Sequence, residues 1–119
     1  MNKQEIENYN RLCAEFLGWK NLNDDSFPEY VNPLGDFYQL KELKFHSDWN
    51  WIMAVVEAIE ELDIIASFQI EQPTIYIWKS SETSTFEGIS IDIFTMSKKE
   101  AVVQAINKFL IWYNNGQRT

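Results

Sequence analysis

The sequence predicts an α+β fold, a three-layer α/β/α sandwich built around a small antiparallel sheet of three to four strands. Two observations support it: helical periodicity at the start, middle and end of the chain, and alternating isoleucines in the middle third. Short links between the alternating segments favour antiparallel neighbours. A length of 119 residues with 45% hydrophobic residues fits one packed domain, residues 1–119, in the order helix, loop, helix, three strands, helix.

The first helix is expected at residues 3–17. Its apolar residues recur at helical spacing: Ile6, Tyr9, Cys13, Phe16 and Leu17. Gly18 follows and can adopt the left-handed conformation that ends many helices. Residues 19–45 then lose the periodicity and contain Asn, Asp, Pro and Gly, interrupted by the aromatic residues Phe27, Tyr30, Phe37 and Tyr38. This pattern predicts a long loop held by aromatic anchors, with a short strand at about residues 37–40.

The second helix is expected at residues 48–62, with Ser47 as the N-cap that accepts a hydrogen bond from a free backbone amide. Its buried stripe consists of Ile52, Val55, Val56, Ile59 and Leu62. Glu57, Glu60 and Glu61 are expected to face water. They lack the spacing and turn glycine of a calcium loop, so the sequence predicts no metal site and no cofactor.

Three strands are expected next, each with two different faces. Apolar residues alternate in all three: Ile64, Ala66, Phe68 and Ile70 in the first, Ile75 and Ile77 in the second, Ile89, Ile91 and Ile93 in the third. A turn is expected at Gln72-Pro73. The isoleucine face should receive the second and third helices. The opposite face carries Tyr76, Trp78 and Phe94, and we expect the first helix to cover it.

The last helix has a clear predicted start. Ser97 and Glu100 have the spacing of a capping box, in which each side chain bonds the backbone amide of the other. One apolar face follows, consisting of Val102, Ala105, Ile106, Phe109, Leu110 and Tyr113. Asn114-Asn115-Gly116 is expected to end the helix.

The net charge of -8 is unevenly distributed. Residues 1–96 hold six of the ten Lys and Arg residues and seventeen of the eighteen Asp and Glu residues. An acidic body repels phosphate and anionic membrane surfaces, so the sequence disfavours nucleic-acid and membrane binding and favours a protein partner with basic groups. Cys13, the only cysteine, excludes an intramolecular disulfide. Together with the absence of a signal-peptide or membrane-spanning pattern, it leads us to expect a cytoplasmic protein.

Candidate functional residues are few. His46 and Asp48 have the types of an orienting pair for general-base chemistry, but no second histidine or serine-nucleophile motif accompanies them, so we predict no catalytic residues. Trp49 and Trp51 point to different sides of one helix. We expect one of them in the core, and the other packed under the aromatic loop or exposed as a binding anchor.

Two segments, ELKFHSDWNWIMAVVEAIEEL and SKKEAVVQAINKFLIWYNN, together with FLGW near the start, resemble a family of small phage and prophage proteins described as a phage ABA-sandwich domain. The resemblance spans most of the chain. It implies helices flanking a sheet and implies no catalytic residue.

A second similarity covers residues 47–113. Their expected helix-strand-strand-strand-helix order and the SKKEA opening look like a double-stranded-RNA-binding domain, with Lys98 and Lys99 at that motif's first basic positions. Val102 stands where another lysine is expected, and the preceding helix is acidic, which opposes contact with phosphates.

The leading functional hypothesis is a non-enzymatic accessory module that binds an unidentified protein partner. Two alternatives stay open, an RNA-binding module that uses Lys98 and Lys99, and a small enzyme that uses His46 and Asp48. The sequence leaves the oligomeric state undetermined.

Overall fold

The structure, a computed structural model, describes residues 1–22, 29–71, 74–79, 86–93 and 96–117. This part of the chain forms a mixed α+β fold with three α-helices and two three-stranded antiparallel sheets. The helices are α1 (Lys3–Phe16), α2 (Trp49–Glu60) and α3 (Lys98–Trp112). The strands are β1 (Lys20–Asn21), β2 (Glu29–Val31), β3 (Phe37–Gln39), β4 (Ile65–Ile70), β5 (Thr74–Lys79) and β6 (Ile89–Asp92). A 3-10 turn, Leu40–Glu42, follows β3, and a π-helical turn, Tyr113–Gln117, follows α3.

The ends of the helices follow capping rules, but one predicted cap is wrong. Ser97 Oγ accepts a hydrogen bond of 3.1 Å from Glu100 N, as expected for the start of α3. At the start of α2, however, the cap is Asp48, whose carboxylate accepts from Asn50 N at 2.8 Å. The prediction of Ser47 as N-cap is wrong because the amides of Ser47 and Asp48 both bond Lys44 O, which places Ser47 inside a turn that precedes the helix. Gly18, just after the C-terminal end of α1, adopts the expected positive φ of 81°.

The larger sheet has the order β4-β5-β6 and is antiparallel throughout, which confirms the predicted meander. Ile77 pairs with Phe68 on one side and with Ile89 on the other. A register shift between Ile65 and Ser67 changes the predicted faces of β4, because an irregularity of this kind reverses the alternation on one side of it. Ile65 is therefore buried, and Ile64, expected on the core face, is only half-buried.

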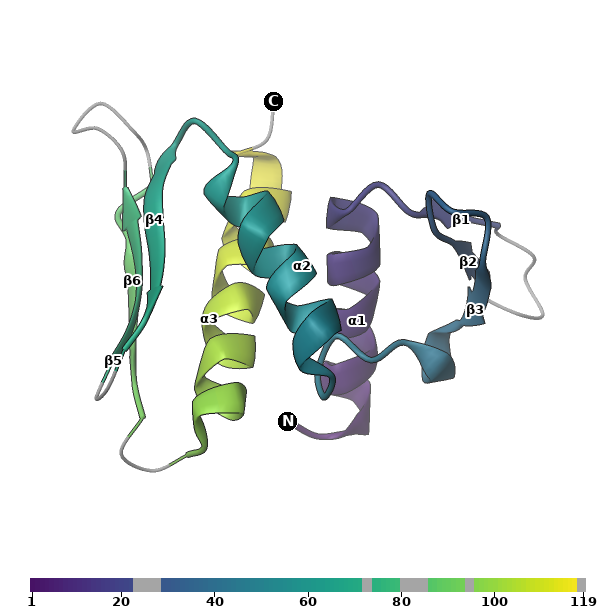
Figure 1. Cartoon of the computed structure of the whole chain (residues 1–119), viewed down its shortest axis with the longest axis horizontal. Helices are drawn as coiled ribbons and strands as arrows, with labels where there is room; N and C mark the ends of the chain where they lie inside the picture. The colour runs from purple at the N-terminus through teal and green to yellow at the C-terminus, as the bar shows by residue number, and fades with distance from the viewer. Residues whose placement is uncertain (23–28, 72–73, 80–85, 94–95, 118–119) are drawn as a thin grey trace.

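Helices α2 and α3 lie side by side on the isoleucine face of this sheet (Figure 1). Ile75 and Ile77 are essentially inaccessible to solvent beneath them. The prediction that these two helices cover the isoleucine face is therefore confirmed.

Helix α1 packs in a different place from the one predicted. Figure 1 shows it beyond α2 and α3, on the side away from the β4-β5-β6 sheet, so the three described α-helices all lie on one side of that sheet. The Phe16 ring contacts the rings of Phe109 and Tyr113 in α3, with centroids 6.4 and 5.5 Å apart. The prediction that the first helix covers Tyr76 and Trp78 is therefore wrong, and the predicted three-layer α/β/α arrangement is not found among the described residues. Phe94 lies outside those residues.

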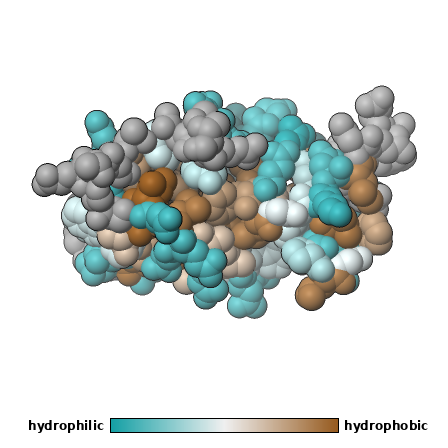
Figure 2. All heavy atoms as spheres, turned by 90° about the horizontal axis from the view of Figure 1, so that it is seen from above, coloured by the Kyte–Doolittle hydropathy of each residue, from teal (hydrophilic) through white to brown (hydrophobic). Residues whose placement is uncertain are grey.

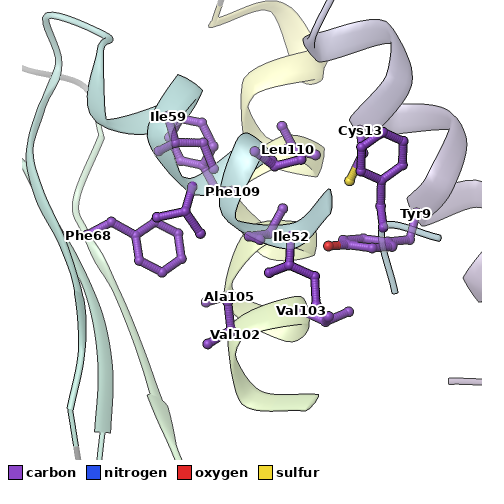
Figure 3. Packing of buried hydrophobic residues seen from close by; sticks show 14 of the residues in the cluster. Tyr9, Cys13, Ile52, Ile59, Phe68, Val102, Val103, Ala105, Phe109 and Leu110 are labelled. Atoms are coloured by element: carbon purple, nitrogen blue, oxygen red, sulfur yellow. The ribbon is translucent and has the colours of Figure 1, made fainter. Parts of the chain in front are cut away.

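The position of α1 is explained by the sequence of α3. Adjacent residues such as Val102 and Val103 are both buried, and so are Phe109 and Leu110, so this helix is apolar on more than one side. The sheet covers one side and α1 covers another. Figure 3 shows the resulting core, in which side chains of α3 pack both toward Phe68 of the sheet and toward α1.

The segment predicted as a long loop contains a second, smaller sheet, β1-β2-β3, next to α1 (Figure 1). The expected strand near residue 37 is β3. The aromatic anchors are confirmed in part. Tyr38 forms one cluster with Trp19, Phe45 and Trp51, with ring centroids between 4.9 and 5.6 Å apart, and Tyr30 is fully buried. Phe37, also expected as an anchor, is 60% exposed, so that part of the prediction is wrong. Phe27 and the expected turn at Gln72-Pro73 lie outside the described part of the chain.

Candidate functional site

The three helices begin at the same end of the molecule, the lower end in Figure 1. A pocket of about 210 Å³ lies there between the start of α1, the start of α3 and the turn that precedes α2. Its lining consists of Met1, Ile6, His46, Glu100, Val103 and Gln104. We refer to it as the His46 pocket. It combines two apolar walls, Ile6 and Val103, with three polar side chains, which is the composition of many small-ligand sites.

His46 is held by a residue from a distant part of the chain. Its Nδ1 lies 3.0 Å from the side-chain Nδ2 of Asn10, in α1. As placed, the amide nitrogen donates, so Nδ1 accepts and the imidazole proton lies on Nε2. Burial lowers the pKa of His46 because it disfavours the charged imidazolium. At neutral pH the ring is therefore uncharged, and Nε2–H is its remaining donor.

Asn10 is itself buried, with only 2% of its surface exposed. Its Oδ1 is also buried and has no hydrogen-bond partner among the described residues. Sequence reasoning missed this residue, although the spacing of Ile6, Asn10 and Cys13 places it on the buried stripe of α1. Cys13 is fully buried as expected, and burial raises the pKa of its thiol far above the ordinary value.

The structure does not join His46 to Asp48. Asp48 is occupied at the start of α2, where its carboxylate accepts from Asn50 N, and no hydrogen bond links it to the imidazole. The polar neighbours of His46 in the pocket are Glu100 and Gln104, one helical turn apart on α3. The enzyme hypothesis therefore loses its predicted carboxylate, and the described residues that line the His46 pocket include no serine or cysteine.

Lys98 and Lys99, the candidate residues at the start of α3, differ in their contacts. Lys99 Nζ donates a 2.8 Å hydrogen bond to Ser47 O and lies 5.8 Å from the centre of the Trp49 ring. Lys98 is exposed. Trp49 is 37% exposed under Lys99, whereas Trp51 is half-buried in the aromatic cluster, so Trp51 is the tryptophan that packs against the former loop segment.

The outer face of the β4-β5-β6 sheet is a second candidate, which sequence reasoning missed because it expected α1 there. Tyr76 and Trp78 stack on this face with centroids 4.9 Å apart and ring planes at 15°. Trp78 is 47% exposed, and its Nε1 donates to Gln69 Oε1 at 3.1 Å. Ser67 lies opposite Trp78, and Ser90 lies opposite Tyr76, so small polar residues flank the two rings.

The opposite ends of the helices frame another hollow, of about 510 Å³. It is lined by Glu15, Phe16, Ala58, Glu61, Leu62 and Tyr113. Figure 2, seen from this side, shows hydrophobic residues at the surface between hydrophilic ones.

Within the described residues no group of three or more His, Cys, Asp or Glu side chains is arranged to hold a metal ion. None of the helices found there is long and apolar enough to cross a membrane.

Comparison with protein-family models, curated proteins and solved structures finds no match for this chain. The proposals about function therefore rest on the surfaces of this chain.

Proposed function

We propose that this chain is a non-enzymatic protein-binding module, an accessory protein of the phage or prophage type that acts in the cytoplasm. Its contact surface is the outer face of the β4-β5-β6 sheet. The observation that supports this most is Trp78, which is nearly half exposed and stacked on Tyr76, on a sheet face that none of the described helices covers.

Large aromatic side chains are costly to leave in water and dominate the energy of many protein interfaces. Here the two rings are already ordered: Tyr76 fixes one side of the indole, and Gln69 holds its Nε1. A partner that buries Trp78 therefore loses little side-chain entropy on binding. The serines opposite the rings supply a polar border, which is typical of a binding patch.

The net charge of the chain indicates which class of protein partner it favours. A net charge of -8 attracts basic proteins and repels acidic ones, so it speeds association with a partner that carries Lys and Arg near its binding surface. We expect binding to weaken as salt is added, because salt screens this attraction.

Affinity capture with matched variants tests the proposal. The wild-type chain should retain one or more proteins from phage-infected or lysogenic cells. Trp78→Ala should lose them, and Trp49→Ala, which removes another exposed tryptophan, at the start of α2, should keep them. Capture of no protein, or equal capture by both variants, contradicts the proposed surface.

RNA binding is the second candidate, because the order α2-β4-β5-β6-α3 with both helices on one sheet face is the layout of the double-stranded-RNA-binding domain that residues 47–113 resemble. Lys98 is exposed at the start of α3, but Lys99 is bonded to Ser47 O. A gel-shift assay at low salt with duplex RNA separates the two functions. A complex that Lys98→Ala weakens supports RNA binding, and no complex with the wild type rejects it.

A further inference from the structure

We propose that the His46 pocket binds an α-aminoacyl group, that is, an ammonium group next to a carbonyl or carboxylate, as in a free amino acid or the first residue of a peptide. The pocket lies away from the outer sheet face, so the two proposals stand independently. The geometry that supports it is a donor, an acceptor and an apolar wall gathered around about 210 Å³.

The donor is His46. Because Nδ1 is bonded to Asn10, the imidazole has one orientation, and Nε2–H is the group left for the pocket. An uncharged imidazole donates a hydrogen bond to a carbonyl or carboxylate oxygen without repelling a nearby ammonium group.

The acceptors come from α3. Glu100 and Gln104 are one turn apart, which places them on the same side of the helix. No hydrogen bond occupies either side chain within the described residues, since the Ser97 amide does not donate the expected return bond to the Glu100 carboxylate. A carboxylate is the natural acceptor for an ammonium group, and the Gln104 amide can accept a further bond or donate one.

Charge and shape agree with this ligand. Glu100 is the acidic side chain among the described residues that line the pocket, and His46 is neutral. Lys99, the residue before Glu100 on the same helix, is directed to Ser47 and Trp49 instead. Lys108, one turn after Gln104, lines a neighbouring hollow. Ile6 and Val103 provide a wall for a small apolar side chain such as that of valine.

The Asn10–His46 pair suits a binding role better than a stabilising one, because burying the Asn10 amide is unfavourable for folding. A buried amide with an unpartnered oxygen costs free energy, and an apolar residue at the same position of α1 avoids that cost. What the amide provides instead is a fixed orientation for the ring that lines the pocket. Asn10 is thus a positioning residue for His46.

The His46 ring itself reports binding. It is the only histidine, so its imidazole carbon–proton signals in an NMR spectrum are unambiguous. Titration with valine, valine amide and N-acetylvaline separates the possible ligands. Valine and valine amide, which keep the ammonium group, should give saturable shifts of the ring signals, and N-acetylvaline, which lacks it, should not. Tighter binding of valine identifies free amino acids as the ligand class, and tighter binding of the amide identifies peptide N-termini.

Two variants with the same charge change complete the test. Glu100→Gln should weaken valine or valine amide binding by about tenfold or more, because a hydrogen bond between charged groups is lost. Glu61→Gln, at the other end of the helices, should leave it unchanged. Thermal unfolding confirms that both variants fold. The proposal is overturned if millimolar valine and valine amide leave the ring signals unshifted, if N-acetylvaline binds equally well, or if the two variants behave alike.

Discussion

Lys99 Nζ lies 2.8 Å from the carbonyl oxygen of Ser47, and this hydrogen bond joins the start of α3 to the turn that precedes α2. The same ammonium group lies over the Trp49 ring. One side chain thus connects the first turns of two neighbouring helices, at the end of the molecule that holds the His46 pocket.

Replacing Lys99 by methionine should lower the free energy of unfolding by about 1 kcal/mol, because the hydrogen bond and the cation–π contact are both lost while the apolar stem is kept. Urea unfolding measures the change. Lys98→Met is the matched control, since Lys98 is exposed, and it should change stability by less than about 0.5 kcal/mol. Equal effects of the two variants contradict the role of Lys99.

The cap of α2 gives a second prediction. Asp48→Ala should destabilise the chain by about 1 kcal/mol, because the Asn50 amide loses its acceptor. Ser47→Ala should have a much smaller effect, since Ser47 precedes the cap in the structure. Denaturant midpoints of the two variants decide between Asp48 and the sequence-predicted Ser47. A larger loss for Ser47→Ala restores the original assignment.

The two tryptophans of α2 should differ strongly. Trp51→Ala removes a ring that contacts Trp19, Tyr38 and Phe45, and we expect a cost of about 3 kcal/mol. Trp49→Ala removes an exposed ring held by one lysine and should cost about 1 kcal/mol or less. Thermal unfolding of both variants measures the difference. Similar midpoints for the two show that the aromatic cluster contributes little.

The shifted pKa of His46 predicts how stability depends on pH. The unfolded chain takes up the imidazole proton near the ordinary pKa of 6.5, whereas the folded chain takes it up only at lower pH. The stabilising contribution is therefore complete above pH 6.5 and is lost as the pH falls through the folded pKa. As the pH falls through 6.5 and below, the free energy of unfolding should fall more steeply for the wild type than for His46→Gln. Parallel profiles for the two chains rule this contribution out.

Much of the fold could be predicted from the sequence because periodicity is a local signal. The 3.6-residue period located all three helices, and the two-residue period located β4, β5 and β6. The position of α1 could not be predicted from its own apolar stripe, which shows that one side is buried and not which partner buries it. A signal did exist in α3, where the adjacent pairs Val102-Val103 and Phe109-Leu110 indicate a helix covered on more than one side.

The candidate site was harder to predict. His46 was recognised, but its partner Asn10 is 36 residues away, and Glu100 and Gln104 come from the far end of the sequence. Only tertiary packing brings these residues together. Asp48 was misleading for the opposite reason, because its local role at the start of α2 already satisfies its carboxylate.

The order of the elements also bears on how the molecule opens. α2, β4, β5, β6 and α3 follow one another along the chain and share one core, whereas α1 lies on the outer side of α3 and belongs to a different stretch of sequence. A covering helix of this kind can detach without breaking any strand pairing. Backbone amides of α1 should therefore exchange with deuterium before those of α3, and each such opening would release His46 from Asn10.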